Sequence, residues 1–172
     1  MTLGYGVQFT RSEAPSDEFR DSVGEILGKS RLFALATVGA AAGAHANTAF
    51  FAVDDGLSLY FVSERTTLHS RNIDTDPRAA ATVFCEAPLY GEQLQGLQLF
   101  GRVEECDGAV LAHALEVYQG RFAEFAQDPE LHERFRAGTA PSALYRFRVE
   151  SLTLLDEPRF GRRNYISATV AR

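Results

Sequence analysis

Five side chains that can bind an anion lie close together near the middle of the chain. They are Ser63, Arg65, Thr66, Thr67 and His69. They surround the start of a short helix predicted over residues 68–73, which ends before the Asp76-Pro77 pair. Because a helix start offers unpaired backbone N–H groups and the positive end of the helix dipole, this segment can bind a phosphate. Ser and Thr at such positions are also typical of simple helix caps, so both interpretations stay open.

Two predicted strands hold this segment in place. In residues 57–63, leucine, phenylalanine and serine alternate with serine, tyrosine and valine, which indicates a strand. After Pro77, residues 79–84 form a compact, apolar and partly β-branched run that is typical of a second strand. The predicted phosphate site therefore lies in the connection between two strands.

A third predicted strand, over residues 45–53, carries polar side chains among apolar ones. Its odd-numbered positions, which include His45 and Asn47, share one face, and its even-numbered positions share the other. His45 and Asn47 either lie at the exposed beginning of the strand or bind a ligand, because buried polar groups need partners. The Asp54-Asp55-Gly56 turn then favours a hairpin into the strand over residues 57–63.

The other predicted elements complete a single domain of 172 residues. An N-terminal arm (1–15) and an amphipathic helix (16–30) precede a barrel with inserted helices (31–156). Within the barrel we predict strands over residues 31–38, 97–105 and 143–156, and helices after Asp107 and over residues 129–136. The tail over residues 157–172 is basic, and its Arg162 and Arg163 are either a solvated terminus or ligands for a phosphate or carboxylate.

Composition and missing motifs exclude several classes of function. The net charge of −6 disfavours a general nucleic-acid binder, and no apolar run is long enough to span a membrane. The two cysteines, Cys85 and Cys106, lie in no CxxC motif, and the four histidines are scattered, so no metal site is predicted. The chain has no GxGxxG, GxSxG or P-loop motif. We expect a cytoplasmic protein without a nucleic-acid or membrane partner.

The order of these elements resembles the flavin-binding split barrels related to pyridoxamine 5′-phosphate oxidase. The segments that carry the resemblance are LFALATV, HANTAFFAVDDGLSLYF, TTLHSRNIDTDPRAAATVF and LQLFGRVEE. The resemblance implies a mainly β fold with flanking helices, namely a six-stranded antiparallel split β-barrel with Greek-key connections. It also implies a homodimer.

In such proteins FMN typically lies in a groove between two subunits. Carried over by position, the flavin ring would lie along the strand residues Asn47, Thr48, Ala49 and Phe50. The phosphate would be bound by Ser63, Thr67 and His69, with Thr66 and either Arg65 or Arg71 nearby. Gln98, or as a second choice Gln95, would contact the flavin edge, and Arg162 or Arg163 would come from the partner subunit. Since a protonated His69 would bind phosphate best, the binding of FMN should weaken as the pH rises past neutrality.

The sequence departs from the true oxidases, which have charged residues on the second strand and an Arg-Lys pair after the serine of the phosphate turn. Here those segments read NTAFFA and TTLHS, and the chain has no tryptophan. Vitamin B6 oxidation is therefore not expected. The leading hypothesis is an FMN-dependent oxidoreductase that uses a small-molecule electron donor such as NAD(P)H and needs no side chain as a base.

Three alternatives remain open. The first is a non-catalytic dimer that binds flavin or haem as a carrier or sensor, with His45, His69 or a tail residue as the axial ligand of the iron. The second is a deazaflavin in place of FMN. The third is a barrel that binds no cofactor and acts through its dimer surface.

Overall fold

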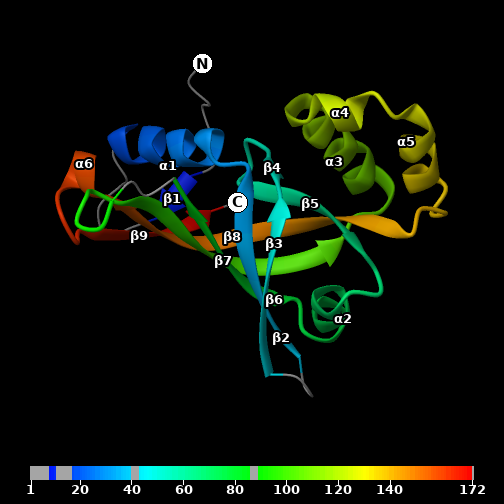
Figure 1. Ribbon diagram of the computed structural model, residues 1–172, viewed down its shortest axis with the longest axis horizontal. Helices are drawn as coiled ribbons and strands as arrows, with labels where there is room; N and C mark the ends of the chain where they lie inside the picture. Colours follow the sequence, from blue (N-terminus) through cyan, green and yellow to red (C-terminus); the bar gives the residue numbers. More distant parts are fainter. Residues whose placement is uncertain (1–7, 11–16, 40–42, 86–88, 172) are drawn as a thin grey trace.

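The computed structural model describes residues 8–10, 17–39, 43–85 and 89–171, and of residues 8–10 the backbone alone. The rest of the predicted N-terminal arm lies outside the described residues, as does part of the turn after residue 39. In the described part of the chain, strands form one sheet in which every pairing is antiparallel. The sheet curls into the predicted split barrel (Figure 1).

The sheet contains nine strands in the described residues, three more than predicted. They are β1 (Gln8–Thr10), β2 (Leu32–Gly39), β3 (Gly43–Phe50), β4 (Ala52–Val53), β5 (Ser58–Glu64), β6 (Arg78–Phe84), β7 (Gln95–Glu105), β8 (Ser142–Asp156) and β9 (Tyr165–Ala171). Neighbouring strands follow the order β1-β9-β8-β7-β6-β2-β3, and β5 pairs with both β4 and β8. The extra strands are β1, β9 and the short β4, which continues β3 after a break at Phe51.

The long strand β8 connects the two halves of the barrel. Along one edge it pairs with β7. Along the other edge its first half pairs with β5 and its second half pairs with β9. Tyr145, Phe147 and Val149 of β8 alternate into the core, as the sequence pattern predicts. After the register shift with β7 the buried positions move to Leu152 and Leu154, which the simple alternation did not predict.

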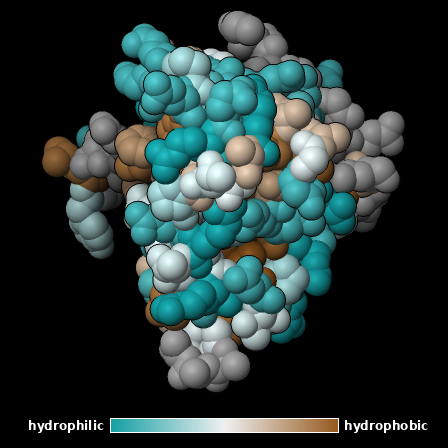
Figure 2. Space-filling view, turned by 90° about the vertical axis from the view of Figure 1, so that its right-hand side faces the viewer, coloured by the Kyte–Doolittle hydropathy of each residue, from teal (hydrophilic) through white to brown (hydrophobic). Residues whose placement is uncertain are grey.

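Helices cover the ends and one side of the barrel. They are α1 (Asp17–Lys29), α2 (Leu68–Thr75), α3 (Gly108–Arg121), α4 (Ala123–Ala126), α5 (Pro129–Arg136) and α6 (Glu157–Phe160). α1 buries Phe19, Val23, Ile26 and Leu27 in the main core. α3 to α5 lie over β5 and build a second core around Tyr60, Tyr118 and Phe122. The outside of this helical region is mainly hydrophilic (Figure 2).

The basic tail is more ordered than its composition suggests. Glu157 and the preceding Asp156 fix it, because the Glu157 carboxylate accepts hydrogen bonds from the backbone N–H groups of Leu94 and Arg163, each at 3.0 Å. Asp156 accepts a hydrogen bond from Ser22 in α1 at 2.6 Å. α6 and β9 follow from these anchors.

A glycine marks the place where β7 and β8 shift their register. The irregularity lies between Phe100 and Gly101. A Cβ atom added to Gly101 would lie 2.0 Å from the carbonyl oxygen of Arg148 and 2.9 Å from its carbon. Since both atoms belong to the backbone, no side chain can move to relieve that overlap.

We therefore expect Gly101→Ala to destabilise the fold by about 2 kcal/mol or more, because β7 and β8 must separate to admit a methyl group. Gly120→Ala is the matched control, since nothing lies within 4 Å of its added Cβ and alanine favours helix α3. Chemical unfolding followed by circular dichroism measures both changes. Equal stability of the two variants would contradict this account of the glycine.

Candidate functional site

A closed network of hydroxyl groups and one imidazole forms the turn between β5 and α2. Nε2 of His69 lies 2.6 Å from Oγ of Ser63 and 3.1 Å from Oγ1 of Thr67. Ser70 joins the network, and its hydroxyl lies 3.3 Å from the Ser63 hydroxyl and donates to the carbonyl of Glu64 at 2.9 Å. The turn thus gathers the three residues that the sequence selected for a phosphate. Ser70 was missed, although its position three residues after Thr67 fits the first turn of a capped helix.

Thr67 is the N-cap of α2. Its Oγ1 accepts a hydrogen bond from the backbone N–H of Ser70 at 3.4 Å, and its own backbone is extended. The simple capping role considered for the sequence is therefore present in the structure. Thr66 is exposed. Its hydroxyl forms no hydrogen bond with another described residue.

His69 lies beside a second histidine. Its ring is parallel to that of His45 on β3, at 6° between planes and 6.0 Å between centroids. Burial lowers the pKa of His69 below the usual value near 6.5, and the charge that His45 can carry lowers it further. At neutral pH the ring of His69 is therefore neutral, and the free turn carries no positive charge from this residue.

Arg65 points away from this turn. Its Nε and Nη2 atoms donate to the carboxylate of Glu105 at 3.0 and 2.7 Å, and its Nη1 donates to the carbonyl of Ala140 at 2.8 Å. The hydrogen bond to Glu105 raises the pKa of the guanidinium. Arg65 therefore ties the start of β8 to the end of β7, and its charge is already neutralised.

The barrel opens between β3 and β5, next to this turn. β4 pairs with β5 through Ala52 and Val53, whereas no described strand pairs with the corresponding edge of β3. Phe51 donates its N–H to the carbonyl of Arg31, so the odd-numbered residues of β3 form the hydrogen-bonded pairs with β2. By alternation, the N–H and C=O groups of Thr48 and Phe50 point toward the opening. The contact of His45 with His69 places this open edge beside the turn.

The four ring-binding residues predicted on β3 thus divide into two pairs. Thr48 and Phe50 are exposed and have free backbone groups. Asn47 and Ala49 are half-buried, and their backbone groups face β2. Oδ1 of Asn47 is buried and forms no hydrogen bond within the described part of the chain. A buried amide oxygen without a partner favours a ligand or a water at this position.

The other predicted site residues lie far from the turn in a single copy of the chain. Gln98 is exposed on β7. Arg162 and Arg163 follow α6, at the opposite end of the molecule from α2 (Figure 1). Arg162 donates to the carbonyl of Gly91 at 2.8 Å. One copy therefore brings together the phosphate turn and β3, but not Gln98 or the two tail arginines.

Gln98 belongs to an uncharged face of the sheet, which we call the neutral face. It is formed by outward side chains of β2, β3, β6, β7, β8 and β9, namely Ala34, Ala36, Ala46, Thr48, Ala80, Thr82, Phe84, Gln98, Phe100, Thr153, Leu155 and Tyr165. Phe84 and Tyr165 are 62% and 57% exposed, so large apolar surfaces face outward. This face was not predicted, although small residues at every second position of β2, β3 and β6 signal it in the sequence.

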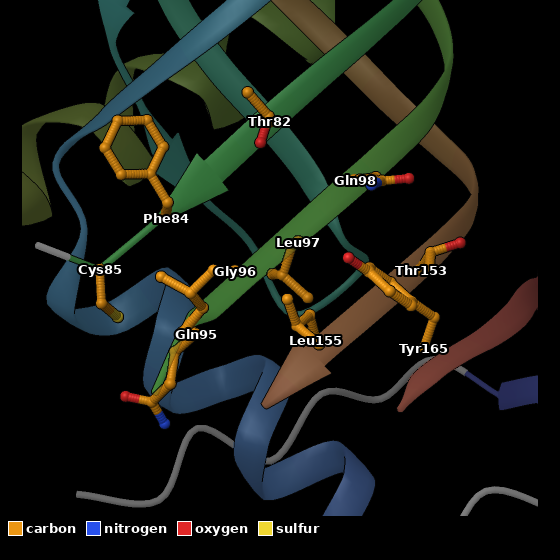
Figure 3. Close-up of a pocket in the computed structure, with 11 residues that line it drawn as sticks. Thr82, Phe84, Cys85, Gln95, Gly96, Leu97, Gln98, Thr153, Leu155 and Tyr165 are labelled. Carbon is orange, nitrogen blue, oxygen red and sulfur yellow. The ribbon is translucent and has the colours of Figure 1, made fainter. Parts of the chain in front are cut away.

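Three connected hollows lie among the described residues, two on the neutral face and one at its margin. One hollow of about 260 Å³ lies between β6, β7, β8 and β9, with Phe84, Gln98 and Tyr165 among the residues around it (Figure 3). A second, of about 370 Å³, lies over the alanines of β2, β3 and β6. The third, of about 790 Å³, lies at the end of α1 and includes Lys29 and Arg31. Shared lining residues connect the three.

The described residues contain no group of three or more His, Cys, Asp or Glu side chains arranged for a metal ion. Both cysteines are free, and burial raises the pKa of the Cys106 thiol to about 12, so it is unreactive at neutral pH. None of the described helices combines the length and the apolar character that crossing a bilayer requires.

The fold defines a split-barrel protein with flanking helices, and the comparisons agree with this class. Residues 19–156 match the family model described as pyridoxamine 5′-phosphate oxidase. The chain belongs to this family. A comparison with curated proteins found no match.

Solved structures with the same fold include haem-binding proteins. A haem-binding protein of Mycobacterium smegmatis is 17% identical with a TM-score of 0.67, over 91% of this chain and 59% of that one. This chain therefore spans about three fifths of that protein. HutZ, the haem storage protein of Vibrio cholerae, is 15% identical with a TM-score of 0.63, over 77% and 92% of the two chains. A Listeria innocua protein described as a pyridoxamine 5′-phosphate oxidase is 16% identical with a TM-score of 0.58, over 78% and 96%.

We expect His69 to titrate below the usual histidine pKa, and His45→Gln to raise its pKa toward 6.5 because a neighbouring positive charge is removed. Titration of the imidazole carbon-bound protons by NMR measures both values. The unfolded chain takes up this proton near pH 6.5 while the folded protein resists it, so His69 lowers the stability as the pH falls below about 6.5.

His113→Gln is the matched control, because His113 contacts Asp54 and Tyr60 on another part of the surface. It should leave the titration of His69 unchanged. A His69 pKa at or above 6.5 in the wild-type protein would contradict the proposed effect of burial.

Proposed function

We propose that the chain is an FMN-dependent oxidoreductase whose flavin lies between two copies. The observation that carries the proposal is the open edge of β3 beside the hydroxyl-rich turn at the start of α2. Backbone N–H and C=O groups at a free strand edge match the polar edge of a flavin ring, and hydroxyl groups at a helix start match a phosphate. Membership of the pyridoxamine 5′-phosphate oxidase family supports the same cofactor.

Each group of residues has a separate task in this proposal. Thr48 and Phe50 would bind the ring through their free backbone groups, and Ser63, Thr67 and His69 would bind the phosphate. Asn47 would supply the buried amide oxygen that now has no described partner. A bound flavin would supply the redox chemistry between a reduced nicotinamide and a second substrate. The protein supplies orientation and access.

The phosphate turn lacks fixed positive charge. Arg65 is held by Glu105, and the lowered pKa keeps His69 neutral before the ligand binds. A bound phosphate would raise the pKa of His69. The affinity for FMN would therefore fall as the pH rises from the pKa of His69 in the free protein to its pKa in the complex. This window begins below 6.5, so the weakening expected from the sequence starts at a lower pH. Without a charge-assisted contact we expect a cofactor that dissociates readily.

The neutral face is the surface we assign to the partner copy. An uncharged sheet face with exposed Phe84, Phe100 and Tyr165 is unusual for a monomer. A twofold axis through this face would bring Gln98 and the tail arginines of one copy toward the open edge of β3 in the other copy. Within a single copy these residues do not reach that edge. Two free cysteines are consistent with a reducing compartment, and a cytoplasmic location is part of the proposal.

Haem binding is the second candidate function. Proteins of M. smegmatis and V. cholerae with the same fold are described as haem-binding and haem storage proteins. The observation that favours it here is the pair of parallel histidine rings, His45 and His69, beside the opening between β3 and β5. A neutral imidazole can ligate iron, so these two residues are the candidate ligands. A deazaflavin would use the same ring and phosphate contacts as FMN.

We expect the purified protein to bind added FMN and to quench its fluorescence, and the double substitution Thr67→Ala with His69→Ala to weaken this binding about tenfold or more. The physical reason is the loss of two hydrogen bonds to the phosphate, each contributing about 1 kcal/mol. Fluorescence titration gives the affinities, and a reduced nicotinamide is then tested as the electron donor.

Thr75→Ala is the matched control, because Thr75 lies at the other end of α2 and its hydroxyl donates to the carbonyl of Arg71. It should leave the affinity for FMN unchanged. A protein that ignores FMN but acquires an intense Soret band with haem would overturn the flavin proposal in favour of the second candidate.

We expect the protein to be a dimer in solution and Ala36→Glu to convert it to a monomer. Ala36 lies in the middle of the neutral face, where burial would strip a carboxylate of water without offering a partner. Light scattering coupled to size-exclusion chromatography measures the mass. Ala112→Glu, on the exposed side of α3, is the control that should remain dimeric. A dimer in both variants would place the interface elsewhere.

A further inference from the structure

Three arginines lie directly opposite one another on three neighbouring strands. Arg78 on β6 faces Arg102 on β7, and Arg102 faces Arg148 on β8. Directly opposed residues of antiparallel strands point to the same side of the sheet. All three are exposed, so they form one row on the outer surface. We call this row the arginine ladder.

The hydrogen-bond pattern brings the three side chains close together. Val103 donates its N–H to the carbonyl of Pro77, so the Arg78 and Arg102 pair is a non-hydrogen-bonded one, with Cα atoms about 4.5 Å apart. Cys106 donates to the carbonyl of Leu144, so the Arg102 and Arg148 pair is hydrogen-bonded, with Cα atoms about 5.5 Å apart. Like charges directly opposite each other destabilise a sheet.

Among the described carboxylates, only Asp76 forms an ion pair with an arginine of the ladder. Asp76 forms a bidentate ion pair with Arg78, at 3.0 Å from Nε and 2.6 Å from Nη2. The pKa of Asp76 is lowered to about 2, mainly by hydrogen bonds from Arg78 and further by the charges of Arg78 and Arg102. Neither Arg102 nor Arg148 forms an ion pair with any described residue.

Two further carboxylates lie on this surface. Glu104 is taken by Arg146, which reaches it with both Nε and Nη2. Glu150 is exposed on β8 beyond Arg148, and it forms no ion pair with another described residue. A row of opposed arginines with two free guanidinium groups is therefore maintained in a chain whose net charge is −6. A ligand of opposite charge would offset the repulsion between them.

We propose that the arginine ladder binds a multiply charged phosphate, either inorganic pyrophosphate or the phosphates of a nucleotide. Planar guanidinium groups donate paired hydrogen bonds to phosphate oxygens, and neighbouring strands hold Arg102 and Arg148 directly opposite each other, so that one multiply charged anion can contact both. The ladder borders the neutral face next to Ala80 and Phe100. It is separate from the turn of Ser63 and Thr67, and the proposal does not depend on flavin binding.

The test is calorimetric titration of the full chain with pyrophosphate at low salt. We expect Arg102→Gln and Arg148→Gln each to weaken the binding about tenfold, the loss of one charge-assisted contact. Arg134→Gln removes an exposed arginine of α5 and is the matched control, which should bind like the wild type. A parallel titration with ADP shows whether a nucleoside adds affinity to that of the phosphates alone.

A second measurement distinguishes a loss of stability from a loss of anion binding. Without anions, Arg102→Gln should raise the melting temperature relative to Arg134→Gln, because it relieves repulsion within the ladder. Three results would overturn the proposal: no binding of pyrophosphate by the wild type, equal weakening by the Arg134 control, or binding that the Thr67 and His69 double variant abolishes and Arg102→Gln leaves intact. The last would assign the anion to the turn instead.

Discussion

Backbone hydrogen bonding along β8 is the constraint on which the rest of the structure depends. Both edges of this strand are paired: β7 pairs along one edge, and β5 and β9 pair with the two halves of the other. The register of β8 against β7 shifts where Gly101 lies close to the Arg148 carbonyl, and this shift falls between the part of β8 that pairs with β5 and the part that pairs with β9. β5 pairs with β8 along its length but with β4 at only two residue pairs, and it does not pair with β3. The opening between β3 and β5 therefore follows from the same arrangement.

The opening and the turn beside it combine many hydrogen-bond donors with little charge. The donors are backbone N–H groups, hydroxyls and an imidazole kept neutral by its surroundings. The nearest sequence candidate for a fixed cation, Arg65, stabilises the connection between β7 and β8 instead. An anion bound there would be held by hydrogen-bond geometry more than by Coulomb attraction, so its affinity would depend strongly on the order of the turn.

The sequence predicted the elements that repeat a simple pattern. Alternation identified β5, β7 and β8, and α5 was predicted over its observed range of residues 129–136. β9 was missed because the basic composition before it suggested a solvated terminus, whereas Asp156 and Glu157 anchor that segment through contacts distant in sequence. The turn residues Ser63, Thr67 and His69 were found from local spacing. The direction of Arg65 was not, because Glu105 lies forty residues away along the chain.

The alanines of the neutral face have a further consequence for association. A methyl group has no rotamers to lose, so a surface built from Ala34, Ala36, Ala46 and Ala80 is already ordered before anything touches it. This part of the surface therefore does not change shape when another molecule binds. Shape complementarity decides which molecule can approach closely enough to gain dispersion energy. One added methylene at any of these positions would fill part of the hollow over the alanines and keep a partner from approaching the surface around it.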